Sequence, residues 1–359
     1  MKYFLSIFFL FILSCSREKH PEPIPLSDRQ IVLHSIGNAV VIRSLLDLQN
    51  SVNGLNEFVN SYVSDPTNKQ KLLALRKEWI NAAVAWKLSS IFLEGQFADG
   101  KRSSNLYTFA DVTSLEETVA SGNPLFDFEY MQSLDENLTG LAAIEYLIYG
   151  VNKGNEELVI TAFKSQGSRR CAYLRALSLD LKQRSDQLLH HWSMAGDGYI
   201  NKFMENSGLE GSASLSNLTA NMISTISRIK DDRIGAPLGI NSMVNPELVE
   251  SKYGAESITL IRAELQSLQQ IFIGERTTTI GVKGLNWLLD QANAKSGNEM
   301  LSDAITAQFT EVYLLLSYIK VPLEQALVTH VKQVEDVYVS LGKLQTLLQD
   351  IPLGLHFQK

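Results

Sequence analysis

Apolar residues recur every three to five positions from Arg29 onward, which is the spacing of helices that bury one face. The second of these stretches follows Pro66 and stops near Gly95, two residue types that mark helix ends. No alternation of apolar and polar residues is long enough to predict a strand. The sequence therefore predicts an all-α protein built as helical bundles. The predicted helices cover residues 31–59, 67–95, 169–192, 298–320 and 322–350.

Short apolar words recur in the same order along the two halves of the chain. The distances between the copies differ, so the connecting loops would have to differ in length. We expect an internal duplication, with a first helical bundle over residues 29–160 and a second over residues 161–357. The paired words are KLSSIFLEG (87–95) with SLQQIFIGE (267–275), GLAAIEYLI (140–148) with GVKGLNWLL (281–289), and LDLQNSVNGL (46–55) with LDLKQRSDQL (179–188).

The N-terminus carries a candidate export signal. Lys2 precedes an apolar run over residues 3–13, which is too short to span a bilayer but fits the core of a signal peptide. The run ends in Ile-Leu-Ser-Cys, which resembles the lipobox of bacterial lipoproteins. That resemblance implies that residues 1–14 are removed and that lipid is attached to Cys15, with the polar, proline-containing residues 15–28 as a tether. An ordinary secretory signal with an incidental cysteine is the alternative.

The composition and charge of the chain limit the classes of partner that it could bind. The chain of 359 residues is 45% hydrophobic and 20% charged, which is typical of a globular protein. The net charge is −7 and no basic run occurs, so we expect no nucleic-acid partner. Once Cys15 is acylated, only Cys171 remains and no intrachain disulfide can form. Cys171 lies in an amphipathic helix, where a buried apolar role is favoured over a reactive thiol.

Common catalytic signatures are missing from the sequence. There is no His-Glu-x-x-His motif, no Gly-x-Ser-x-Gly motif and no phosphate-binding glycine loop. The histidines follow no metal-ligand spacing, and we expect those of the folded region to be surface or capping residues. The chain has six histidines, of which His20 lies in the predicted tether, and the others are His34, His190, His191, His330 and His356.

One carboxylate interrupts an otherwise apolar stretch of the sequence. Glu145 lies in the apolar stretch GLAAIEYLIYG, where burying a lone charge is costly. It could ligate a metal together with a distant histidine, such as His34 or His191. It could pair with an arginine, for which Arg76 and Arg170 are the candidates, or it could face water. Pairing with an arginine is the favoured interpretation, because it is the least costly way to keep a carboxylate there.

Two further features are candidates for the same site. Glu250 and Ser251 belong to a polar cluster that precedes a predicted helix, and they are candidate ligand-binding residues. The alternative is that this cluster only caps the helix, with Ser257 as the N-cap residue. Trp79 and Trp86 lie seven residues apart on one helix face, which favours core packing.

The stretch GLAAIEYLIYG resembles the signature of the imelysin family (peptidase M75), Gly-x-His-x-x-Glu followed by an apolar run and a glycine. The resemblance extends over residues 30–357. It implies an all-α fold of two related bundles that form one domain, a metallopeptidase label and an association with iron uptake. Other words that agree are LRKEWINAAVAW (75–86), RRCAYLRALSLDL (169–181), RIGAPLG (233–239), NPELVESKYGAESI (245–258) and LGLHF (353–357).

The signature is incomplete in this chain. Gly140 and Glu145 match its glycine and glutamate, but Ala142 stands where the family has histidine. Histidine and glutamate three residues apart on a helix share a face and could hold iron or zinc, whereas alanine supplies no ligand. We therefore expect any metal site at Glu145 to be weakened, and we expect no catalytic residues.

These features together predict a lipid-anchored binding protein of the bacterial cell envelope, linked to iron uptake and without catalysis. It would be periplasmic or surface-exposed on the outer membrane, held by Cys15. Its candidate partner is an outer-membrane iron or haem transporter. Two alternatives stay open, namely an M75-type metallopeptidase with a rebuilt metal site and an envelope scaffold protein.

Overall fold

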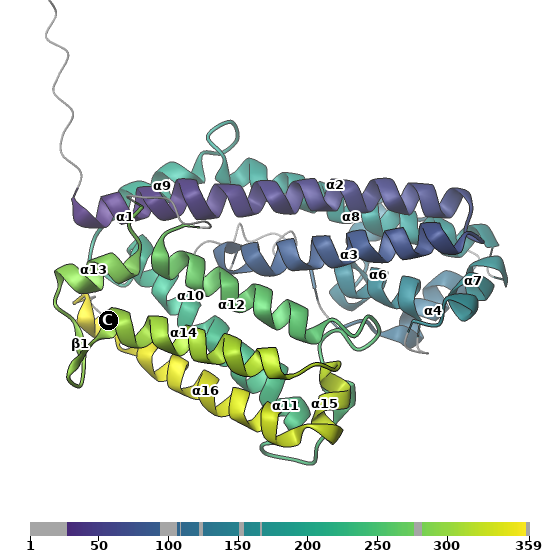
Figure 1. Cartoon of the computed structure of the whole chain (residues 1–359). Coiled ribbons are helices and arrows are strands. Elements are labelled where there is room, and N and C mark those ends of the chain that lie inside the picture. The colour runs from purple at the N-terminus through teal and green to yellow at the C-terminus, as the bar shows by residue number, and fades with distance from the viewer. Residues whose placement is uncertain are drawn as a thin grey trace, which may run out of the picture.

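A computed structural model gives the arrangement of the chain (Figure 1). It describes residues 27–93, 106–107, 109–121, 125–150, 154–165, 167–275 and 282–356. The signal peptide, Cys15 and most of the tether expected from the sequence lie outside these residues.

The first bundle is formed by long helices around α2. A continuous helix of α1, the π-helical turn η1 and α2 runs the length of the molecule, with α3 and α8 packed along α2 and α6 between α3 and α8 (Figure 1). Its elements are α1 (Asp28–Ile36), η1 (Gly37–Val41), α2 (Ile42–Ser64), α3 (Lys69–Ser89), η2 (Ser90–Leu93), α4 (Val112–Ala120), α5 (Phe128–Ser133), η5 (Glu136–Leu138), α6 (Gly140–Tyr149), α7 (Glu156–Ser165), α8 (Gly167–Trp192) and α9 (Tyr199–Glu205).

The second bundle is built from α10, α12, α14 and α16. A short hairpin precedes α14, and its strands β1 and β2 have two residues each. The sequence did not predict it. The elements are α10 (Ser214–Arg228), η6 (Ile229–Gly235), α11 (Ala236–Leu238), η7 (Pro246–Leu248), α12 (Ser257–Ile273), α13 (Leu285–Gln291), β1 (Lys295–Ser296), β2 (Glu299–Met300), α14 (Leu301–Tyr318), α15 (Leu323–Thr329), α16 (Val331–Gln349) and α17 (Ile351–Gly354).

The all-α prediction is confirmed, and the helix ends follow local chemistry. Ser27 begins α1 with a capping box, since its hydroxyl accepts from the Gln30 amide and the Gln30 side chain accepts from the Ser27 amide. The single helix expected over residues 322–350 is two helices that separate at His330. They diverge because α15 packs against α11 and η7, whereas α16 packs against α10 and α14.

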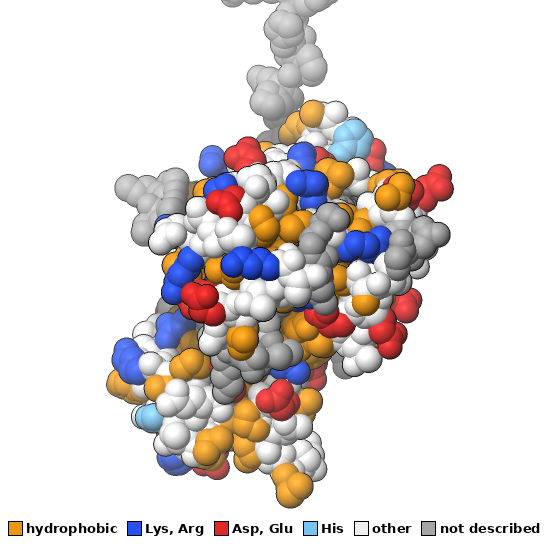
Figure 2. All heavy atoms as spheres, turned by 90° about the vertical axis from the view of Figure 1, so that its right-hand side faces the viewer, with side chains coloured by type: hydrophobic (Ala, Val, Ile, Leu, Met, Phe, Trp, Pro, Cys, Tyr) orange, Lys and Arg blue, Asp and Glu red, His pale blue; other side chains and the backbone are white. Residues whose placement is uncertain are grey.

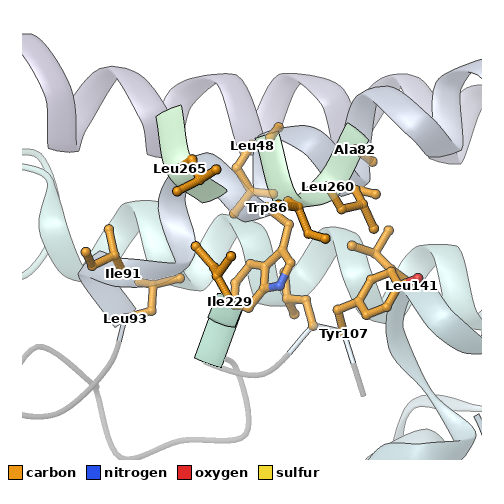
Figure 3. Packing of buried hydrophobic residues seen from close by; sticks show 14 of the residues in the cluster. Leu48, Ala82, Trp86, Ile91, Leu93, Tyr107, Leu141, Ile229, Leu260 and Leu265 are labelled. Atoms are coloured by element: carbon orange, nitrogen blue, oxygen red, sulfur yellow. The ribbon is translucent and has the colours of Figure 1, made fainter. Parts of the chain in front are cut away.

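The bundles share one hydrophobic core, and α3 lies at its centre. This helix contacts α2 and α6 in the first bundle and α12 in the second. Trp86 of α3 is buried beside Leu260 and Leu265 of α12, as Figure 3 shows. Both tryptophans of α3 are therefore core residues. The bundle boundary expected at residues 160 and 161 would separate α8 from α2 and α6, the helices that it contacts.

Among the described residues, one helix is long and apolar enough to cross a membrane, by length and composition only. It is the continuous helix over residues 28–64, which lies near the N-terminus. Half of its most apolar window is buried within the protein, and residues such as Leu48 and Val52 contact the common core. Its apolar character is thus explained by burial against the other helices.

The start of α6 depends on a glycine. Gly140 has φ +73°, and a Cβ there would lie 2.5 Å from the carbonyl oxygen of Leu106. We expect Gly140→Ala to lower the free energy of unfolding by about 3 kcal/mol, because it adds this clash to a left-handed backbone. The matched control is Gly297→Ala, with φ +63° and open space around the position, for which a loss of about 1 kcal/mol is expected. Urea unfolding measures both, and equal losses would contradict the close contact.

Candidate functional site

Glu145 lies in the middle of α6, and every residue of this helix is buried. The helix is enclosed by α3, α8, α4 and α7. Glu145 points to the junction with the second bundle, where only 1% of its surface is exposed. A carboxylate in this position must find hydrogen-bond donors within the protein.

Four donors converge on the Glu145 carboxylate. The Tyr107 hydroxyl donates to Oε2 at 2.6 Å. On the other oxygen, Oε1 accepts from the Ser251 hydroxyl at 2.8 Å, the Gly254 amide at 2.8 Å and the Tyr253 amide at 3.2 Å. The carboxylate of the first bundle therefore holds the loop that precedes α12 in the second.

The loop is shaped to enclose this carboxylate. A Cβ on Gly254 would lie 3.3 Å from both Glu145 Oε1 and the Trp79 ring, so the glycine permits the close approach. The Ser251 amide donates to the Ser257 hydroxyl at 3.1 Å, which ties the loop to the first turn of α12. Glu256 occupies the N-cap position, so the alternative in which Ser257 is the N-cap residue is wrong.

A second set of buried charges crosses the same junction. Lys87 of α3 reaches two carboxylates of the second bundle, with its Nζ 2.7 Å from Glu250 Oε1 and 3.3 Å from Glu264 Oε2. The Arg233 guanidinium lies 3.0 Å from Glu250 Oε1. Two carboxylates of the second bundle thus pair with a lysine of the first, and Arg233 adds a second cation beside Glu250. Charge compensation of this kind is what a low-dielectric interior requires.

Burial and hydrogen bonding act on the carboxylates in opposite directions. Burial raises the pKa of Glu145 to about 7, against the lowering effect of its four donors. Burial and the neighbouring carboxylates raise the pKa of Tyr107 well above its usual value, so its hydroxyl keeps its proton. Burial also acts to raise the pKa of Glu250, but Lys87 and Arg233 outweigh it and hold that pKa below its usual value.

The structure brings the three candidate residues Glu145, Glu250 and Ser251 to one junction. Ser251 contacts Glu145, whereas Glu250 is turned toward Lys87. Neither candidate arginine pairs with Glu145, so the favoured interpretation from the sequence is wrong.

The two arginines are engaged elsewhere. Arg76 donates to the carbonyls of Ile148 and Gly154, at 2.9 and 3.0 Å. Arg170 pairs with Glu116 at 2.8 Å. Backbone amides and hydroxyls supply the donors that Glu145 needs, and they are invisible to a search for opposite charges.

The histidines considered as distant ligands are also elsewhere. His34 belongs to α1, and His191 at the end of α8 lies 3.2 Å from Asp197. Helix α1 lies at the end of the molecule opposite α6 (Figure 1), and α9, the helix that follows α8, packs against α1. Among the residues that the structure describes, no group of three or more His, Cys, Asp or Glu side chains could hold a metal ion.

Sequence reasoning missed Tyr107, Lys87, Glu264 and Arg233. A signal existed for two of them, because Lys87 is the single charge in the apolar stretch AVAWKLSS, and Glu264 lies in the largely apolar stretch LIRAELQSL, which it shares with Arg262. Burying a charge in an apolar stretch is as costly for these two residues as it is for Glu145. Tyr107 and Arg233 carried no comparable signal.

Comparison with known proteins decides the family. The sequence model of imelysin (peptidase M75) matches residues 41–349. This chain belongs to the imelysin family. No curated protein matches the sequence.

Two solved structures share the imelysin fold with this chain. One is a protein named as an iron-regulated protein A precursor from Parabacteroides distasonis, with 17% identity, a TM-score of 0.75, and coverage of 94% of this chain and 97% of that one. The other is an imelysin-like protein from Psychrobacter arcticum, with 14% identity, a TM-score of 0.68, and coverage of 93% and 98%. At these identities the likeness shows the fold.

The residues around Glu145 do not fit the metal site that the imelysin signature implies. Ala142, one turn before Glu145, is buried and offers only a methyl group. Both carboxylate oxygens already accept hydrogen bonds from hydroxyl or amide groups, whose protons would face a cation. A metal would have to displace these donors, so the geometry is that of a hydrogen-bond acceptor.

The Lys87 cluster gives a test of the junction. We expect Lys87→Met to lower the free energy of unfolding by about 3 kcal/mol, because it leaves Glu250 and Glu264 buried with less compensation. The control is Lys69→Met, which removes a more exposed lysine 3.7 Å from Glu156 and should cost no more than about 1 kcal/mol. Urea unfolding at neutral pH is the measurement. A loss at Lys87 as small as at Lys69 would mean that the cluster contributes little.

The pKa of Glu145 gives a pH-dependent test. Its folded value of about 7 lies above the ordinary value of 4.5, so the folded protein retains a proton that the unfolded chain has lost between these values. Wild-type stability should therefore fall by up to about 3 kcal/mol as pH rises through this window, through this group alone. Glu145→Gln removes the titration and keeps an acceptor for the loop.

The stability of Glu145→Gln relative to wild type should thus increase from pH 4.5 to 7 and level off above. Unfolding midpoints across this range measure it. Glu57→Gln, at an exposed position of α2, is the control. A difference between Glu145→Gln and wild type that does not change with pH would contradict the raised pKa.

Proposed function

We propose that this imelysin-family chain is a lipid-anchored binding protein of the bacterial envelope, linked to iron uptake and without catalytic activity. The family, the structural neighbour named as iron-regulated and the N-terminal apolar run support this proposal. The anchor would be lipid on Cys15. An outer-membrane iron or haem transporter is the proposed partner.

The hydrogen bonding and burial of Glu145 are the main support for the non-catalytic role. A general base needs a free lone pair directed at its substrate, and a metal ligand needs one directed at the ion. Both oxygens of Glu145 accept hydrogen bonds, and the side chain is closed off from solvent. Its role is to position the loop of residues 250–254 at the junction of the two bundles.

The metallopeptidase alternative makes the opposite demand on this residue. A rebuilt metal site would use Glu145 as a ligand, and iron or zinc would be its metal. Glutamine is a poor substitute for a ligating carboxylate, yet it can replace the hydrogen-bond pattern. Its carbonyl would accept from the loop, and its amide would donate to the Tyr107 oxygen. Glu145→Gln therefore separates the two functions.

The test is growth of a deletion strain under iron limitation. We expect the deletion to slow growth, and both wild-type and Glu145→Gln genes to restore it. Glu145→Leu should fail, because it leaves the buried hydroxyls of Tyr107 and Ser251 without an acceptor, at about 1–3 kcal/mol each, and removes the acceptor of two half-buried amides. Measuring the amount of each variant in the envelope separates lost function from lost protein.

A second assay addresses catalysis directly. Purified wild-type protein should show no chelator-sensitive cleavage of unfolded casein. Cleavage that a chelator abolishes, and that Glu145→Gln also abolishes, would establish the peptidase and overturn the proposal. Growth that does not depend on the gene would favour the scaffold alternative.

A further inference from the structure

An exposed apolar surface lies at one end of the second bundle. The loop between α11 and η7 presents Ile240, Met243 and Val244 to solvent, and η7 presents Leu248. Met243 is 87% exposed. Val328, which is 68% exposed, is carried by α15, the helix that packs against α11 and η7. We call these five residues the apolar tip. Figure 2 shows hydrophobic side chains gathered at this lower end of the molecule.

The loop is held in one conformation. Gly239 has φ +76°, and a Cβ there would lie 2.5 Å from the Val244 nitrogen, so the chain folds tightly back on itself. The Asn245 amide donates to the Pro237 carbonyl at 2.9 Å, which closes the base of the loop. The exposed side chains are thus displayed by a fixed turn.

The loop also lacks charge. Residues 236–246 contain no Asp, Glu, Lys or Arg. The first carboxylate after them, Glu247, lies 3.5 Å from Lys252, so its charge is compensated. Moving such an uncharged apolar surface from water into an apolar environment does not require the desolvation of an unpaired charge.

The position of Ser27, the first residue that the structure describes, indicates how near the apolar tip can lie to the bilayer that would hold the anchor. Ser27 lies beside Leu355 and His356, with which it lines one cavity of about 360 Å³. The 19 residues of α16 run from the α15 end of the bundle back toward these residues, a length of about 28 Å. Eleven residues lie between Cys15 and Ser27, and the chain from one to the other can extend to about 40 Å.

The tether is therefore long enough for the second bundle to lie along the bilayer that holds its anchor. We propose that the apolar tip docks into the headgroup region of that bilayer. The inference rests on the lipid anchor of the proposed function. Docking would fix the orientation of the junction between the bundles relative to the membrane and to a transporter in it.

The experiment uses the full lipidated chain in vesicles of phosphatidylethanolamine and phosphatidylglycerol. A nitroxide is attached to Met243→Cys in a Cys171→Ser background, and its collisions with oxygen and with a polar nickel chelate are measured by electron paramagnetic resonance. The matched control is Met194→Cys, because Met194 is 65% exposed in the turn after α8 and lies outside the apolar tip. We expect the ratio of oxygen to nickel accessibility to rise several-fold at position 243 on vesicles and to stay unchanged at position 194.

Three results would overturn the inference or its premise, and they differ. A label at position 243 that remains fully accessible to the nickel chelate on anchored protein would overturn the docking. Dipolar broadening between labels at 243, with or without vesicles, would show that a second copy covers the tip instead. Loss of vesicle association in wild type, or its persistence in Cys15→Ser, would overturn the lipid anchor itself.

Discussion

The structure depends on hydrogen bonds that cross from one bundle to the other at Glu145. This carboxylate belongs to the first bundle, and three of its four donors belong to the loop before α12 in the second. The hydroxyls of Tyr107 and Ser251 would otherwise be buried polar groups without this acceptor. The requirement fixes the position of Gly254 against Trp79 and the start of α12. The two bundles therefore share a polar centre as well as an apolar core.

Lys87 makes the reciprocal contact. It brings a positive charge from the first bundle to Glu250 and Glu264 of the second. Separating the bundles would expose apolar surface around Trp86 and would also break both polar connections. Any binding event at this junction has to compete with contacts that are already satisfied. These satisfied contacts are the support for the proposed non-catalytic role.

The sequence predicted the helices and the family but misplaced the partners of Glu145. Helical periodicity identified the long helices, because burial of one face leaves a mark at every turn. The lone charge at Glu145 correctly indicated a buried polar site, and Ser251 lies in it. Two of its four donors are the backbone amides of Tyr253 and Gly254, which no side-chain pattern encodes. The break at His330 depends on where α15 packs, which is a long-range contact.

We infer that Glu145 accepts hydrogen bonds and does not ligate a metal. Anomalous X-ray diffraction from crystals soaked separately in iron and zinc salts, recorded at each metal's absorption edge, would show a bound ion directly. We expect no anomalous peak within about 2.3 Å of the Glu145 oxygens, with Ser251 and Gly254 still hydrogen-bonded to them. A strong peak at that distance, with the loop displaced and other side chains completing the coordination, would contradict this inference.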